Sequence, residues 1–135
     1  SPWRPVIHVR DVVSALLSGL KAPKNIISGK AYNVGIENGN YTVKDLADVV
    51  QKLVPNCNIV YTKEHLVDPR SYKVSFKRIL LDLKDYYKPE WTLEKGGQEL
   101  LDFFDKIKLT ENNFRGLKTN RINNIKFKIR LQSQI

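Results

Sequence analysis

Residues 4–11 read Arg4-Pro5-Val6-Ile7-His8-Val9-Arg10-Asp11, a short β-branched, apolar run set between charged residues. The run over 6–9 predicts a buried strand, because it is short and rich in β-branched residues. Asp11 is expected to be the N-cap of a helix over 12–20, which has a broad apolar face. A strand that leads directly into a helix is typical of α/β proteins, so this stretch sets the fold class.

The alternation of strand and helix continues along the chain. Two further strands are predicted over 31–35 and 58–62. Thr42 and Asp45 have the spacing of a capping box, which predicts a helix that ends before Pro55. The sequence thus predicts an α/β fold of short strands alternating with helices.

The second half of the chain has weaker signals. Ser75 is expected to cap a short helix over 79–83, and Thr92 a longer one that ends near residue 107. Residues 63–70 read as a polar surface loop. The alternating apolar residues over 122–131 predict an edge strand or a docked arm.

Composition limits the classes of function. The 135 residues suit one domain, with 41% hydrophobic residues and no apolar run long enough to cross a membrane. The start has no signal-peptide pattern, and a single cysteine, Cys57, forms no internal disulfide. We therefore expect a cytoplasmic protein without a membrane partner.

The net charge of +9 is concentrated at the C-terminal end. From Lys106 onward there are eight basic residues and one acid, Glu111, a balance of +7, which leaves 9 − 7 = +2 for residues 1–105. A charged tail of this kind is usually a solvated segment. We therefore divide the chain into a body over 1–107 and a basic tail over 108–135, and nucleic acid is not the partner that we expect.

Two arginines, Arg4 and Arg70, each stand beside an extended apolar run. A guanidinium presents five donors in a planar fork, which suits a phosphate or a diphosphate. The plainer interpretations are a stacking contact of Arg4 with Trp3 and a surface ion pair of Arg70 with Asp68, worth only ~0–1 kcal/mol.

Other candidates are weaker. His8, Asn33 and Tyr72 could line a substrate pocket or be structural; for His8 a buried, hydrogen-bonded role is favoured over catalysis, and for Asn33 a turn. Tyr41 and Lys44 are three residues apart with a helix start between them, so we reject them as a catalytic pair. The chain has no Gly-x-Gly-x-x-Gly loop, no Walker A motif and no metal-ligand spacing, so no catalytic, cofactor-binding or metal-binding residue is predicted.

Four motifs in order resemble the extended short-chain dehydrogenase/reductases. They are Arg4-Pro-Val-Ile-His-Val-Arg-Asp11, Ala31-Tyr-Asn-Val-Gly35 followed by Tyr41-Thr-Val-Lys-Asp-Leu-Ala47, Asp68-Pro-Arg-Ser-Tyr-Lys-Val-Ser75, and Pro89-Glu-Trp-Thr-Leu-Glu-Lys-Gly96 with Glu99-Leu100. Over about residues 3–107 the chain looks like the C-terminal, substrate-binding part of a nucleotide-sugar epimerase or dehydratase. One departure is Leu83-Lys-Asp-Tyr-Tyr-Lys-Pro89, where relatives have Leu-Gly-Phe or Leu-Gly-Trp before the proline.

The resemblance implies a Rossmann-type parent enzyme that uses NAD(P) and a Tyr-x-x-x-Lys pair, neither of whose motifs occurs in this chain. It implies that Arg4 and Arg70 contact the diphosphate of a nucleoside-diphosphate sugar, and that His8 and Asp11 are structural. The chain would then lack the N-terminal dinucleotide-binding half and be inactive alone, and the parent would be a homodimer. The alternative is a non-catalytic sugar-nucleotide or protein-interaction module derived from that fold. A third hypothesis, nucleic-acid binding by the tail, predicts an affinity that falls steeply with salt.

Overall fold

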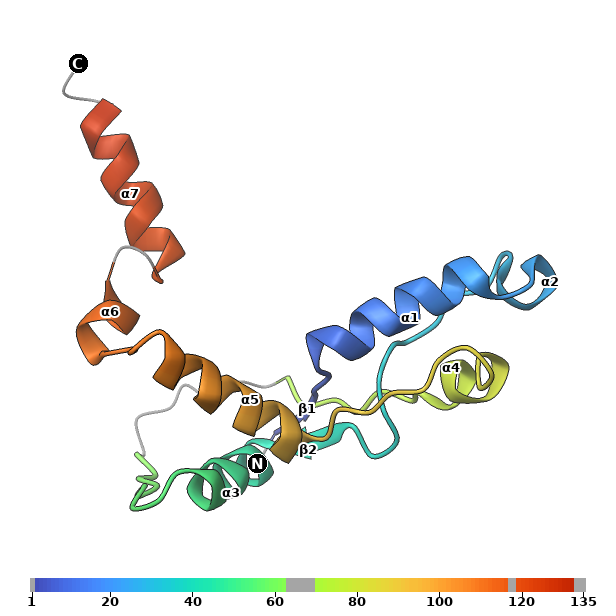
Figure 1. The fold of residues 1–135 in the computed structure, drawn as a ribbon, viewed down its shortest axis with the longest axis horizontal. Helices are drawn as coiled ribbons and strands as arrows, with labels where there is room; N and C mark the ends of the chain where they lie inside the picture. The colour runs from blue at the N-terminus through green and yellow to red at the C-terminus, as the bar shows by residue number, and fades with distance from the viewer. Residues whose placement is uncertain (1, 63–69, 117–118, 133–135) are drawn as a thin grey trace. The chain divides into compact units, whose positions relative to one another are not determined.

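The computed structural model describes residues 2–62, 70–116 and 119–132, and the chain forms two compact units, Ser1–Gln98 and Glu99–Ile135 (Figure 1). The predicted loop over 63–70 lies, except for Arg70, outside the described residues. The functional division that we placed after residue 107 stays a prediction. The elements are β1 (Trp3–Pro5), α1 (Val9–Lys21), α2 (Lys24–Ile27), β2 (Asn40–Thr42), α3 (Val43–Leu53), α4 (Lys77–Asp82), α5 (Leu93–Lys106), α6 (Glu111–Arg115) and α7 (Arg121–Gln132).

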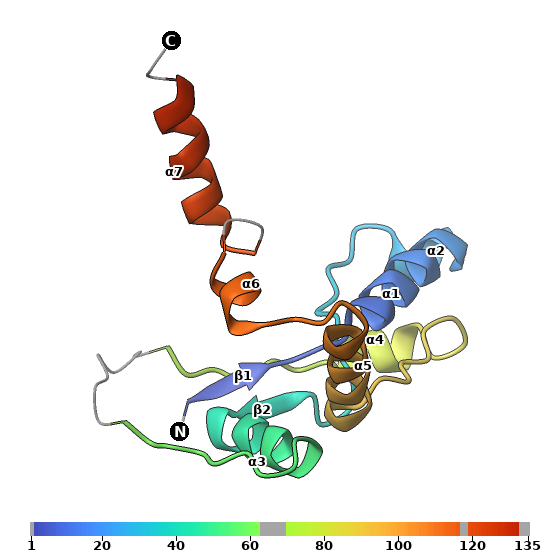
Figure 2. The same cartoon turned by 60° about the vertical axis from the view of Figure 1, so that its left-hand side comes forward.

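The sheet of the first unit has two short antiparallel strands. β1 pairs with β2 in the register Trp3↔Thr42, Arg4↔Tyr41 and Pro5↔Asn40, and α3 follows β2 without a break (Figure 2). The mixed α/β composition expected from the sequence is confirmed. The described residues are mostly helical, and their strands form only this small antiparallel sheet.

The three strands predicted from apolar runs are wrong. No strand contains residues 6–8, 31–35 or 58–62. The two strands that do form lie at residues 3–5, just before the first predicted run, and at residues 40–42, after the second. Beyond Pro5, the Val6 N–H still donates to the carbonyl oxygen of Gly39 at 2.9 Å, and α1 begins at Val9. The apolar runs instead contribute side chains to packing: Tyr32 and Val34, for example, pack against the core.

Helix α1 begins three residues earlier than predicted, and Asp11 is not its N-cap. His8 is the N-cap, because its Nδ1 accepts a hydrogen bond from the backbone N–H of Arg10 at 3.3 Å. Asp11 lies in the first turn, where a negative charge suits the helix dipole, and is only 3% exposed.

The predicted caps of two later helices are confirmed. The Thr42 N–H donates to Oδ2 of Asp45 at 2.7 Å, and the Asp45 N–H donates to Oγ1 of Thr42 at 3.1 Å, which is a complete capping box. Thr92 Oγ1 accepts from the Lys95 N–H at 3.2 Å at the start of α5. The prediction that Ser75 caps the next helix was wrong. Phe76 is the N-cap of α4 and makes no side-chain capping bond.

The core of the first unit lies between α1, α4 and the turn that follows α4. Its buried members are Ala15, Ala22, Phe76, Ile79, Leu83 and Tyr87. The close approach of Phe76 requires Gly35, since a Cβ at that position would overlap the Phe76 ring. The Tyr87 hydroxyl donates to the carbonyl oxygen of Gly35 at 3.1 Å. These contacts fix residue 35 and the start of α4 against each other.

Helix α1 buries its small and polar face and exposes much of its apolar face. Its buried positions are Asp11, Ala15 and Ser18, which are small or polar. Ser18 Oγ donates to the carbonyl oxygens of Ser14 and Tyr86, so the buried hydroxyl is satisfied. Its large apolar side chains are instead 47–84% exposed, namely Val9, Val13, Leu16, Leu17 and Leu20.

The C-terminal part of the second unit is helical, which corrects the edge strand predicted over 122–131; the alternative, a docked arm, stays a prediction. Residues 121–132 form α7, and Oδ1 of Asn120 accepts from the Asn123 N–H at 3.0 Å in its first turn. Alternating apolar residues on a helix fall on several sides, so α7 has no single apolar face. Its apolar side chains are 47–65% exposed.

Within the described ranges, no helix is both long and apolar enough to cross a membrane.

Candidate diphosphate-binding site

The structure brings the two predicted arginine motifs together. Arg4 lies in the middle of β1, and its Nη1 donates to the backbone carbonyl oxygen of Arg70, 66 residues further along. The same nitrogen donates to the carbonyl oxygen of Trp3 at 2.8 Å. Both acceptors are backbone carbonyl oxygens, and the two bonds orient the guanidinium. The side chain of Arg70 is exposed.

Two further contacts fasten the segment 70–76 to the sheet. The Trp3 N–H donates to Oγ of Ser71 at 3.1 Å. The side-chain amide of Asn40 bonds both backbone groups of Val74, donating to its carbonyl oxygen at 2.9 Å and accepting from its N–H at 2.8 Å. One amide therefore replaces the two hydrogen bonds that a neighbouring strand would make. The segment that follows Arg70 is therefore held to β1 at Ser71 and to β2 at Val74.

A third cation belongs to the same segment. The Nζ atom of Lys73 lies 3.6 Å from the centre of the Trp3 ring, a close cation–π contact. Trp3 thus contacts Ser71 through its N–H, Arg4 through its carbonyl oxygen and Lys73 through its ring.

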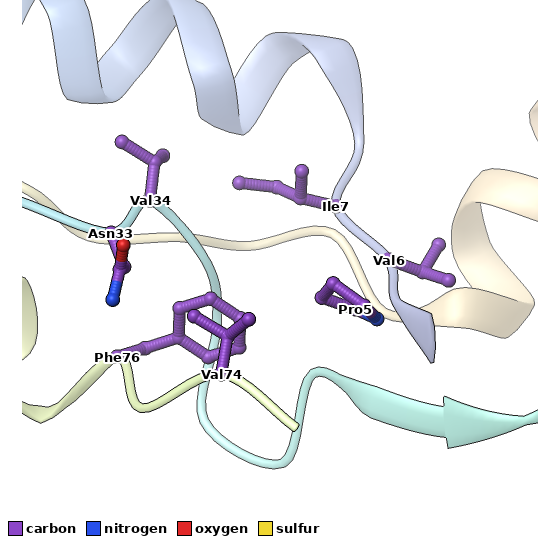
Figure 3. A pocket seen from close by; sticks show the side chains of 7 residues that line it. All are labelled: Pro5, Val6, Ile7, Asn33, Val34, Val74 and Phe76. Carbon is purple, nitrogen blue, oxygen red and sulfur yellow. The ribbon is translucent and has the colours of Figure 1, made fainter. Parts of the chain in front are cut away.

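A pocket of about 200 Å³ opens beside this cluster (Figure 3). In Figure 3, Ile7 and Val34 lie on one side of it and Val74 and Phe76 on the other. Its lining is Pro5, Val6, Ile7, Asn33, Val34, Val74 and Phe76. The walls are apolar except for Asn33, whose Nδ2 donates to the carbonyl oxygen of Ser75 at 3.3 Å.

The other predicted pocket residues lie differently. Asn33 lines this pocket, whereas Tyr72 is 53% exposed and is not among the residues that line it. His8 is half-buried and stacks on Trp91, with ring centres 4.0 Å apart and planes at 12°. Together with its capping bond, this contact supports the structural role that the sequence favoured.

Asp11 has a role that the sequence did not reveal. Its two carboxylate oxygens accept from the backbone N–H groups of Glu90 and Trp91, each at 3.1 Å. These bonds hold the segment before α5 against the start of α1. Arg10 and Lys95 lie over the Trp91 ring, 4.9 and 4.4 Å from its centre.

Sequence reasoning missed Ser71, Lys73 and Asn40. Ser71 and Lys73 stand inside the motif that contains Arg70, so the motif itself was the available signal. Asn40 follows Asn38-Gly39, a pattern typical of turns, and nothing in it indicates a partner 34 residues away. Lone polar residues carry no signal of such a long-range contact.

Tyr41, the strand partner of Arg4, is a further ionisable group near the cluster. Burial raises the pKa of its phenol, and the negative charge of Glu94 raises it further. The phenol therefore stays neutral near pH 7 and adds no negative charge beside Arg4. Among the described residues, no group of three or more His, Cys, Asp or Glu is placed to hold a metal ion.

The arrangement can hold and orient an anion next to an apolar pocket. The cations described in this cluster, Arg4, Arg70 and Lys73, suit positioning rather than bond breaking. No protein-family model matches the chain, and no solved structure matches it significantly.

Proposed function

We propose that this chain is the nucleotide-sugar-binding portion of an NAD-dependent epimerase or dehydratase of the extended short-chain dehydrogenase/reductase type. The observation that carries the proposal is the bond from the Arg4 guanidinium to the Arg70 carbonyl, which joins two motifs 66 residues apart. An anion-binding role requires both arginines in one place, and the sequence alone could not bring them there.

The role of the arginines is to bind the diphosphate. A guanidinium forms charge-assisted, often bidentate hydrogen bonds with phosphate oxygens, each worth about 1.5–3 kcal/mol. The apolar pocket next to them, with Asn33 at its wall, would receive an adjoining part of the ligand. Binding of the non-reacting diphosphate then fixes the sugar for a reaction carried out elsewhere.

The residues present do not fit NAD(P). The chain has neither a Gly-x-Gly-x-x-Gly loop nor a Tyr-x-x-x-Lys pair, so no step of the reaction is assigned to its side chains. Under this proposal the cofactor and the proton-transfer residues belong to the N-terminal half of a cytoplasmic, homodimeric parent enzyme, and the chain is inactive alone. Reading the coding sequence upstream of Ser1 tests that part. A glycine fingerprint followed by Tyr-x-x-x-Lys supports an enzyme, and their absence favours a non-catalytic module.

Binding is tested by thermal unfolding of the 135-residue chain. A ligand that binds only the folded state raises the melting temperature, and the stabilisation grows with the logarithm of its concentration relative to Kd. We expect nucleoside-diphosphate sugars to raise it and the matching nucleosides, which lack phosphate, to leave it unchanged. Equal effects of sugar nucleotide and nucleoside, or none from either across uridine, guanosine, adenosine and thymidine compounds, would contradict the proposal.

A further inference from the structure

We propose that Lys73 is a third cation of the diphosphate site and that Trp3 positions it. This inference rests on the proposed function and extends it, because neither residue was among the expected ligand contacts. It assigns to Lys73 direct contact with a phosphate and to Trp3 a positioning role.

The first support is geometric. Trp3 is next to Arg4 on β1, and the Arg4 guanidinium donates to the Trp3 carbonyl oxygen at 2.8 Å. The Lys73 ammonium rests 3.6 Å from the centre of the Trp3 ring, and the backbone of the same tryptophan bonds Ser71. The segment that supplies Arg70 therefore also delivers Lys73 to the strand that supplies Arg4.

The second support is electrostatic. Across the described residues, Lys73 forms no ion pair with a carboxylate, and its side chain is exposed. The face of an indole attracts a cation but compensates its charge only in part. A phosphate oxygen forms a much stronger, charge-assisted bond with an ammonium group. Lys73 thus has a stronger partner to gain when a phosphate arrives.

The third support is the difference between the two kinds of cation. Guanidinium forks hold oxygens in a fixed plane, whereas an ammonium group is a compact point charge on a flexible stem. With Arg4 oriented by its carbonyl bonds, Lys73 can turn from the Trp3 ring toward whichever phosphate is closer.

The test is calorimetry of the full 135-residue chain with inorganic pyrophosphate, which carries the diphosphate chemistry without a base or sugar. We expect Lys73→Gln to weaken binding about threefold to tenfold, the effect of one screened charge contact. Lys73→Arg should keep the affinity within about twofold, because it keeps the charge. Lys84→Gln, which removes an exposed lysine elsewhere, is the matched control and should have no effect.

Trp3 fluorescence gives a second readout that a purely structural role would not produce. If Lys73 leaves the ring on binding, pyrophosphate should change the emission of the wild-type chain, and Trp3→Phe or Lys73→Gln should remove that change. Trp91 supplies a constant background.

The outcomes separate this inference from the proposed function. Wild-type affinity in Lys73→Gln, with binding lost in the Arg4→Ala, Arg70→Ala double variant, would overturn the role of Lys73 alone. Weakened binding in Lys73→Gln with an unaffected arginine double variant would keep Lys73 and overturn the arginine assignment. Absence of pyrophosphate binding by the wild-type chain would overturn both.

Discussion

The carboxylate of Asp11 accepts a hydrogen bond from the backbone N–H of Trp91, 80 residues further along the chain, at 3.1 Å. Its other oxygen accepts from Glu90 in the same way, and the side chain is buried. An acid at the start of a helix thus serves as the tie between α1 and the segment that leads into α5.

Replacing Asp11 should destabilise the protein, and alanine should cost more stability than asparagine. Asp11→Ala leaves two part-buried N–H groups without their acceptor, and we expect a loss of about 1–3 kcal/mol in the free energy of unfolding. Asp11→Asn keeps one oxygen and should lose less. Urea denaturation followed by circular dichroism measures both. Equal stability of Asp11→Ala and the wild type would show that the tie is not formed in solution.

The capping box of α3 should make stability sensitive to acid. The N–H of Thr42, and then its hydroxyl, hold the pKa of the Asp45 carboxyl below its usual value of 3.8. A lowered pKa in the folded state gives stability that is complete above the unfolded pKa and is lost as pH falls below it. We expect the wild type to lose more stability than Asp45→Asn between about pH 5 and pH 3.

Urea midpoints across that range measure the difference. Asp85→Asn, which removes an exposed carboxylate outside the box, controls for the change in net charge. Parallel acid profiles of Asp45→Asn and the wild type would argue against the box.

Tyr87 should produce the opposite dependence at alkaline pH. Burial, and then the charge of Asp11, raises the pKa of Tyr87 from 10.0 to about 12. Because the folded pKa is the higher one, the stabilisation is complete below pH 10 and is lost as pH rises toward 12. Tyr87→Phe should flatten this decline, and at neutral pH it should lose about 1 kcal/mol with the bond to Gly35.

Denaturation midpoints at neutral pH and at two pH values between 10 and 12 test this. Tyr86→Phe, at a more exposed neighbouring tyrosine, is the control. A decline in Tyr87→Phe as steep as in the wild type would contradict the buried position.

Because α1 buries small residues and exposes large apolar ones, stability should depend more on Ala15 than on its neighbour Leu16. Ala15 is 6% exposed and packs in the core, so Ala15→Leu should overfill it and lower the free energy of unfolding by about 1–3 kcal/mol. Leu16 is 65% exposed, so Leu16→Ser should change it by no more than about 0.5 kcal/mol. Thermal and urea denaturation compare the pair. A larger loss for Leu16→Ser would mean that the helix is turned the other way.

Local signals in the sequence predicted local structure well. The capping box of Thr42 and Asp45 and the cap at Thr92 were found because each depends on residues three apart. The broad apolar face of residues 12–20 predicted α1 correctly as a helix. It could not predict which face would be buried, because its small and polar residues turned out to form the packed side.

Strands were predicted poorly because apolar β-branched runs indicate burial but do not name a partner. The runs at 6–9 and 31–35 do contribute to packing and to the pocket, yet the ladder formed at Trp3–Pro5 and Asn40–Thr42. For the candidate site, the motifs supplied Arg4 and Arg70, but their meeting through a backbone carbonyl, and the support from Asn40, depend on contacts far apart in the chain.

The most direct test of the central claim, that Arg4 and Arg70 together grip a diphosphate, is calorimetry of the 135-residue chain with the nucleoside-diphosphate sugar that raises its melting temperature most. We expect the Arg4→Ala, Arg70→Ala double variant to bind about a hundredfold more weakly, the loss of two charge-assisted contacts. The control is Arg121→Ala, Arg130→Ala, which removes two arginines of α7 and should bind as the wild type does. An unchanged affinity in the Arg4, Arg70 variant would contradict the site.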